Sequence, residues 1–206
     1  MKRIEIHPVN PQPRLIHQLA EQFQTGALVA LPTDASYVLA CHLEDRTAVD
    51  RMRQLRGIDE KHLLTLLCRD LSELSQYAQV DNRQFRFLKE WTPGAYTFIL
   101  PATREVPRRL MHPSRKTVGL RVPEAPIVQA LLAELGVPLL CASLILPGDE
   151  DPLSDPDDIQ DRIGKRIDLL VDGGAGQLEA TSVIDVTGDE PVIQRVGMGP
   201  VEAMLR

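Results

Sequence analysis

The chain has 206 residues, of which 43% are hydrophobic and 25% are charged, and its formal net charge is −6 at pH 7. This length suits one domain of generous size, and no linker-like segment divides the sequence, so we expect a single domain over residues 1–206. The acidic balance argues against a general nucleic-acid binder, and no apolar run reaches the ~20 residues of a membrane span. Residues 1–10 lack the apolar segment of a signal peptide, so we expect a cytoplasmic protein with no membrane partner.

Apolar residues at helical spacing alternate with short apolar runs along the chain. The helical spacing predicts helices over residues 13–24, 47–55, 82–91, 126–135, 156–162 and 200–205, with a short helical turn at 70–71. The apolar runs predict strands over residues 3–7, 28–31, 37–41, 62–68, 95–101, 118–122, 138–146, 167–171, 182–186 and 192–196. Short turns join several neighbouring strands, which favours a mixed sheet over a purely parallel one. We therefore expect an α/β domain with a twisted mixed sheet flanked by helices.

Residues 28–41, LVALPTDASYVLAC, place polar side chains between two apolar runs. Pro32 ends strand pairing because it has no N–H to donate. Thr33, Asp34 and Ser36 follow, and such short polar side chains bond either to ligands or to the backbone of a turn. The stretch therefore predicts either a binding site at a strand end or a plain turn between two buried strands.

Two further polar residues interrupt or end apolar strands. Ser143 lies inside an apolar run, so its hydroxyl needs a partner, which is either local backbone or a ligand. Arg121 comes shortly before Pro123 at a strand end, where a guanidinium group offers a rigid fork to a phosphate or carboxylate, or forms a surface ion pair. The glycine-rich residues 173–176 lack the lysine of a P-loop, which favours a surface loop over a phosphate site.

The cysteines and histidines give no sign of a metal centre. Cys41, Cys68 and Cys141 each lie in an apolar run without the spacing of a zinc site, which favours buried thiols in a reducing compartment. The five histidines form no pair one helical turn apart. We expect no protein-bound metal.

Charge is unevenly distributed along the second half of the chain. Residues 104–121 contain six basic side chains and one acid, whereas residues 149–161 contain seven acids and no base. A basic stripe on an acidic protein can bind phosphates locally, although both stretches also fit an ordinary solvated surface. The residues of the stripe that we predict to contact RNA are Arg108, Arg109, Arg115 and Lys116.

Several segments together carry a family resemblance. They are PTDASYVLAC, RQLRGIDEKHLLTLL, TPGAYTFIL, KTVGLRVPEAP, CASL, TSVIDVT and IQRVG. The chain resembles the YrdC/YciO family and is most similar to its YciO branch, which is related to threonylcarbamoyl-AMP synthases. The resemblance implies a YrdC-like fold with a concave, positively charged cavity that binds nucleotide and double-stranded RNA. Enzymatic members make L-threonylcarbamoyladenylate from threonine, bicarbonate and ATP with Mg²⁺, for the threonylcarbamoyladenosine modification of tRNA.

The resemblance also implies roles for single residues. By position in the family motifs, the residues expected to hold the amino acid are Thr33, Asp34 and Tyr37. Those expected to act in catalysis are Arg56 and Ser143, and those expected to face the nucleotide are Arg121, Ser182 and Arg195.

Departures from the motifs limit this expectation. Gln54 stands where the family has a lysine, and Ile145 stands where it has an asparagine, although Arg53 or Lys61 could replace the lysine. Loss of one such donor commonly reduces a rate by about 10²-fold or more. The sequence therefore predicts a nucleotide- and RNA-binding protein with weak or altered synthase chemistry. The alternative is a non-catalytic double-stranded RNA or ribosome-associated binding protein.

Overall fold

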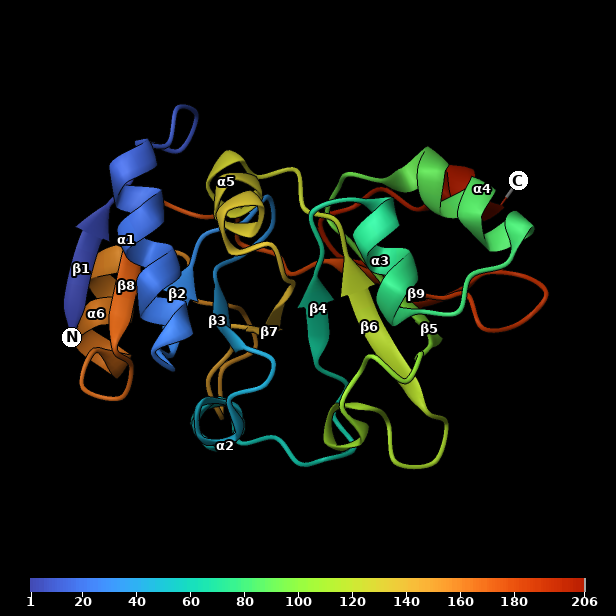
Figure 1. Ribbon diagram of the computed structural model, residues 1–206, viewed down its shortest axis with the longest axis horizontal. Coiled ribbons are helices and arrows are strands. Elements are labelled where there is room, and N and C mark those ends of the chain that lie inside the picture. Colours follow the sequence, from blue (N-terminus) through green and yellow to red (C-terminus); the bar gives the residue numbers. More distant parts are fainter. Residues whose placement is uncertain (206) are drawn as a thin grey trace.

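One continuous sheet runs through the molecule, whose computed structural model describes residues 1–205 (Figure 1). Its strands are β1 (Lys2–Glu5), β2 (Val29–Leu31), β3 (Val38–His42), β4 (Thr65–Leu67), β5 (Tyr96–Pro101), β6 (Thr117–Arg121), β7 (Leu139–Ser143), β8 (Leu169–Asp172), β9 (Ser182–Asp185) and β10 (Val192–Arg195). The order across the sheet is β1-β8-β2-β3-β7-β4-β6-β5-β9-β10. Parallel pairs, such as β4 with β6, stand beside antiparallel pairs, such as β3 with β7, so the prediction of a mixed sheet is confirmed.

The helices lie on both faces of this sheet. They are α1 (Pro13–Gln24), α2 (Arg46–Arg56), α3 (Leu71–Tyr77), α4 (Asn82–Trp91), α5 (Pro126–Leu135) and α6 (Pro156–Ile163), with short 3₁₀ helices η1 (Arg108–Leu110) and η2 (Glu202–Leu205). In Figure 1, α1 and α5 lie beside each other over one half of the sheet, and α6 lies behind β8. None of the helices within residues 1–205 combines the length and hydrophobicity that a membrane span requires.

Local sequence explains where several elements begin and end. Proline is the first residue of α1, α5 and α6, where a missing N–H leaves no helical bond unmade. Asp70 caps α3 by accepting a hydrogen bond from the backbone N–H of Glu73 at 2.9 Å, so the short turn predicted there is a helix of seven residues. The strand predicted over residues 138–146 ends earlier, at Ser143, because the chain turns after Leu144 and the Ile145 N–H donates back to the Ser143 carbonyl at 2.9 Å.

Two hydrophobic cores lie on opposite faces, as strand alternation requires. The first core packs α1 and α5 against the sheet, with Phe23 and Leu131 fully buried. The second core packs the other helices against the opposite side-chain face, with Met52 and Phe98 fully buried. All three cysteines are buried and free, which confirms the expectation of buried thiols.

We expect Phe23→Ala to lower the free energy of unfolding by about 3–5 kcal/mol, because it removes a fully buried ring and leaves a cavity between α1 and the sheet. Urea denaturation followed by circular dichroism measures the difference. The matched control is Phe85→Ala, whose side chain on α4 is 40% exposed and whose loss should cost about 0.5 kcal/mol or less. Equal effects of the two substitutions would contradict this account of the core.

Candidate functional site

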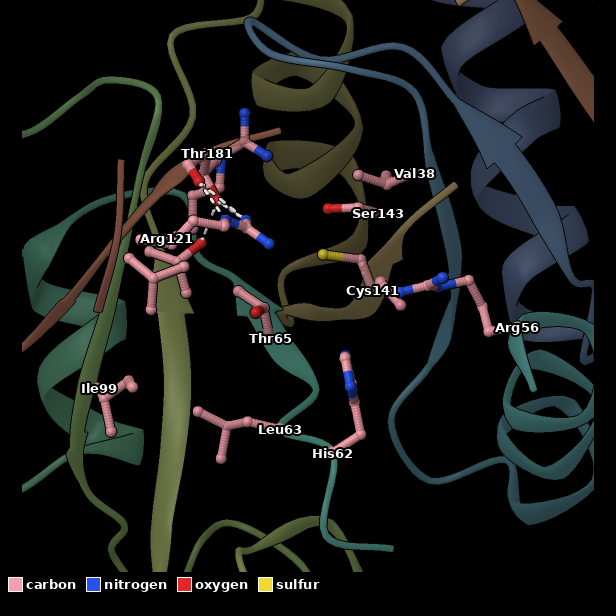
Figure 2. Close-up of a pocket in the computed structure, with 14 residues that line it drawn as sticks. Val38, Arg56, His62, Leu63, Thr65, Ile99, Arg121, Cys141, Ser143 and Thr181 are labelled. Atoms are coloured by element: carbon pink, nitrogen blue, oxygen red, sulfur yellow. Dashed lines mark hydrogen bonds between the residues drawn. The ribbon is translucent and has the colours of Figure 1, made fainter. Parts of the chain in front are cut away.

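A cavity of about 190 Å³ lies on the sheet face that carries α1 and α5, beside the half that these helices cover. Its walls come from β3, β4, β5, β6, β7 and β9, from Arg195 at the end of β10 and from Arg56 at the end of α2. Figure 2 shows Arg56 entering from one side and Arg121 with Thr181 on the other, with Ser143 and Cys141 between them. Within residues 1–205, three arginines and no aspartate or glutamate line this cavity.

Arg56 is oriented by a main-chain carbonyl. It is the last residue of α2, which ends at Gly57 in the left-handed conformation (φ 64°). Its Nη1 donates to the carbonyl of Ile145, while its Nε is buried without a partner in the described chain. Burial, and then the nearby guanidinium group of Arg195, lower the pKa of Arg56. Arginine nevertheless stays charged at neutral pH, so Arg56 brings a positive charge to the cavity.

Arg195, at the end of β10, is likewise oriented by a main-chain carbonyl. Its Nε and Nη2 donate to the carbonyl of Thr181 at 3.1 and 2.8 Å. The Thr181 hydroxyl shares a 2.8 Å hydrogen bond with the hydroxyl of Thr97 on β5, and both threonines line the cavity. Burial lowers the pKa of Arg195 as well. Neither Arg56 nor Arg195 has a carboxylate partner among the ion pairs of the described chain, so their charges remain available to a ligand.

Arg121 differs because the chain itself supplies its counter-ion. Its Nη2 forms an ion pair with Asp34 and donates to the Thr33 hydroxyl at 3.0 Å. Asp34 also accepts from the backbone N–H of Glu124 at 2.9 Å, and the side chains of Arg121 and Asp34 are 3% and 13% exposed. Arg121 lines the main cavity, whereas Thr33 and Asp34 line a neighbouring hollow of about 160 Å³. The amino-acid-binding role implied for Thr33 and Asp34 stays a prediction.

Tyr37 anchors the glycine-rich loop. Its hydroxyl donates to the Gly174 carbonyl at 2.7 Å and accepts from the Gly173 N–H at 3.3 Å, and the residue is fully buried. A Cβ on Gly176 would lie 2.8 Å from the Tyr37 ring, so the loop needs glycine to approach it. Burial raises the pKa of Tyr37 to about 12, so the phenol stays protonated. Tyr37 is absent from the described cavity lining, and its predicted ligand contact is untested.

The cavity lining includes one of the two serines expected at the site, Ser143, and also Thr181, which the sequence analysis did not single out. Ser143 is half-buried and lines the cavity at the end of β7. Ser182 is fully buried and donates to the Gly199 carbonyl at 2.5 Å, so it lies away from the cavity that its neighbours Thr181 and Val183 line. The missed signal is strand alternation, because residues one apart on β9 point to opposite faces.

Cys141 also lines the cavity, where the family motif has serine. Burial raises the pKa of its thiol to about 12. The thiol is therefore protonated at neutral pH and is a poor nucleophile. Within residues 1–205, no group of three histidine, cysteine, aspartate or glutamate side chains is arranged to hold a metal ion.

The structure locates the departures from the family motifs. Gln54 is exposed on α2, and Lys61 is exposed in the loop that follows. Arg53 donates from Nη1 to the carbonyl of Asp59 at 2.6 Å, and neither Arg53 nor Lys61 is among the described residues that line the cavity. Ile145 contributes its carbonyl to Arg56. In this arrangement neither Arg53 nor Lys61 takes the place of the missing lysine at the cavity.

Most of the basic residues predicted to contact RNA are engaged with the protein. Arg109 is half-buried and donates from Nη2 to a carbonyl in the loop before α2 at 2.9 Å. Arg115 lies 3.3 Å from Asp185 on β9, and Lys116 donates to a carbonyl of its own loop at 2.6 Å. Arg108 is exposed on η1. RNA contact by this stretch stays a prediction.

We expect Asp34→Asn to lower the free energy of unfolding by up to about 3–5 kcal/mol, because it leaves the buried Arg121 charge without its counter-ion. Urea denaturation at pH 7 measures the loss. The matched control is Asp157→Asn, which breaks a pair with Arg3 at a site where the aspartate is 81% exposed and should change stability by about 1 kcal/mol or less. A loss at Asp34 no larger than the control would show that the Arg121 pair contributes little.

Comparison with known proteins agrees with this architecture. A family model named for Sua5, YciO and YrdC, described as telomere recombination, matches residues 21–197. The YciO protein of Escherichia coli K12 is 52% identical over 200 residues, which is 97% of each chain. The crystal structure of E. coli YciO superimposes with a TM-score of 0.96 at 50% identity, covering 99% of this chain and 100% of that chain.

More distant relatives carry enzyme names. A threonylcarbamoyl-AMP synthase from Vibrio vulnificus is 27% identical over 184 residues, which is 87% of this chain and 97% of that protein. The crystal structure of P. abyssi Sua5 complexed with L-threonine has a TM-score of 0.90 at 25% identity, and the match covers 99% of this chain and 60% of that one. The chain therefore belongs to the Sua5/YciO/YrdC family, as a YciO-type member related to threonylcarbamoyl-AMP synthases.

Proposed function

We propose that this chain binds ATP beside a carboxylated amino acid in the cytoplasm and has weak or altered L-threonylcarbamoyladenylate synthase activity, linked to the threonylcarbamoyladenosine modification of tRNA. The observation that carries the proposal is the pair Arg56 and Arg195, whose charges enter one cavity and are oriented by carbonyls instead of carboxylates. Partly buried cations without counter-ions favour a multiply charged anion, because the anion replaces the hydration that burial removed. A triphosphate is such an anion.

The size of the site supports a nucleotide. A hollow of about 200 Å³, lined in part by Ile145 and Glu179, adjoins the main cavity and shares Arg195 with it. Together the two exceed the roughly 300 Å³ at which small-molecule sites usually begin. We propose that the phosphates lie between Arg56 and Arg195 and that the rest of the nucleotide extends over the adjoining hollow.

The relatives suggest the second substrate. The V. vulnificus relative is named a threonylcarbamoyl-AMP synthase, and the P. abyssi Sua5 structure contains L-threonine. In the proposed reaction, the amino group of threonine condenses with bicarbonate to a carbamate and water is released. A carboxylate oxygen of the carbamate then forms a bond to the α-phosphorus of ATP while the bond from that phosphorus to pyrophosphate breaks. No protein nucleophile is needed, so positioning and charge neutralisation determine the rate.

Four polar residues of the cavity have proposed parts in this scheme. Arg56 and Arg195 neutralise charge on the phosphates. Ser143 and Thr181 offer hydroxyl groups to the carbamate. Mg²⁺ enters with ATP as part of the substrate, because the described lining of the main cavity contains no carboxylate, although Glu150, Asp151 and Glu179 line the adjoining hollow.

Pyrophosphate release tests the proposal. We expect slow release that requires ATP, threonine and bicarbonate together, and we expect Arg56→Gln and Arg195→Gln to reduce it by about 10²-fold each, on the order of 3 kcal/mol in the barrier. The matched control is Arg104→Gln, whose side chain is 96% exposed and should leave the rate unchanged. Ser143→Ala tests the hydroxyl in the same assay. Release no greater than the no-enzyme background, with every component present, would overturn the synthase proposal.

The second candidate is double-stranded RNA or ribosome-associated binding through Arg108, Arg109, Arg115 and Lys116. The exposed position of Arg108, with the exposed Arg104 four residues before it, favours this candidate, but internal contacts occupy the other three side chains. If RNA binds here, we expect affinity for a double-stranded oligonucleotide to fall steeply as salt rises from 50 to 200 mM, on the order of 10-fold or more. We expect Arg108→Gln to reduce the slope, as fluorescence anisotropy would measure. Absence of binding at 50 mM salt would remove this candidate.

A further inference from the structure

His62 is a cavity residue that the proposed mechanism does not use. It lies in the loop between α2 and β4 and lines the cavity together with Arg56 and Arg195. Figure 2 shows its ring rising into the cavity from the side opposite Thr181 and Arg121. The cavity therefore holds a titratable group beside two uncompensated guanidinium groups.

The loop fixes the direction of this side chain. The backbone N–H of His62 bonds to Asp59, with distances of 3.3 Å to its carbonyl and 3.2 Å to its Oδ1. Arg53 donates to the same Asp59 carbonyl at 2.6 Å, which ties the loop to the last turn of α2. The contacts between His62 and Asp59 involve the backbone of His62 and leave its imidazole ring free to bond to a ligand.

The charges around the ring determine its protonation. Although His62 is exposed at the cavity rim, partial burial of the ring lowers its pKa, and Arg56, Arg195 and Arg53 lower it further, while Asp59 acts in the opposite direction. The ring is therefore mostly neutral at pH 7 in the ligand-free protein. An anion between Arg56 and Arg195 would cancel the repulsion and favour the protonated ring.

We propose that His62 is a third anion-binding group of the cavity, which gains a proton from solvent when a polyphosphate binds and then donates a charge-assisted hydrogen bond to it. The proposal rests on nucleotide binding as proposed above and adds a residue that confers pH dependence. It supplies, at a new position, a positive charge that Gln54 cannot provide. The sign follows from linkage. The ring binds its proton more tightly in the complex, so anion binding strengthens as pH falls from the pKa of His62 in the complex to its lower pKa in the free protein.

Isothermal titration calorimetry with ATP tests this inference. Titrations at pH 7 in two buffers of different ionisation enthalpy give the number of protons taken up, and titrations from pH 6 to 8 give the affinity profile. We expect the wild-type protein to take up more protons than His62→Gln, and its affinity to rise more steeply at low pH, by at most about tenfold per pH unit for one proton. The comparison with His62→Gln removes the contribution of the titrating phosphate.

Two further variants serve as comparisons in the same titrations. We expect His62→Lys to restore affinity at pH 8 without the extra proton uptake, because its charge is permanent. His17→Gln, at a surface histidine that is 63% exposed, should behave as the wild type. Thermal unfolding confirms that each variant is folded.

The outcomes separate the two proposals. If ATP binds but proton uptake and pH profile are the same in wild type and His62→Gln, the role of His62 is wrong and nucleotide binding stands. If ATP does not bind the wild-type protein at any pH, nucleotide binding and the role of His62 are both overturned.

Discussion

The incomplete covering of one sheet face is the constraint on which the rest of the structure depends. α1 and α5 pack side by side and bury only the half of the face that carries β1, β8 and β2 and reaches β3 and β7 (Figure 1). Beyond these two helices the same face lines the cavity, and Thr65 and Thr97 stand where a core would have aliphatic residues. Gly119 lies between these threonines, and a Cβ there would stand 2.9 Å from the Thr65 hydroxyl. In this half of the sheet, one face thus packs on a rigid hydrophobic core, and the opposite face forms the polar wall of the cavity.

The partner of each arginine decides what that arginine can do. Arg121 is neutralised by Asp34, so its first role is to join β6 to the loop after β2. Arg56 and Arg195 are held by carbonyls, which fix direction without removing charge. A buried ion pair contributes chiefly geometry, whereas an oriented cation without a counter-ion retains its attraction for a ligand. Although all three arginines line one cavity, Arg121 therefore holds two segments together, whereas Arg56 and Arg195 can attract an anion.

Sequence patterns predict most of the fold because apolar periodicity is strong in alternating helices and strands. They miss the end of β7, since Leu144 stays fully buried beyond it and the apolar run gives no sign that the chain turns back at Ile145. The family motifs imply that Ser182 faces the nucleotide, which stays a prediction, while in the structure its neighbours Thr181 and Val183 line the cavity. Contacts across long stretches of chain, such as Tyr37 with Gly174, 137 residues apart, have no local signal at all. The motifs mark the right segments, and the register decides which side chain of a segment lines the site.

The departures from the family motifs affect binding and catalysis differently. Gln54 and Ile145 remove two donors, yet the two cations that would attract a triphosphate remain. Ile145 even helps to hold one of them, through its carbonyl rather than its side chain. Ground-state affinity for an anion depends on net charge in the cavity, whereas rate depends on donors aimed at charge that develops only in the transition state. We therefore expect a chain that keeps the positive charge of the cavity but loses part of the transition-state donors to bind a nucleotide well and turn it over slowly.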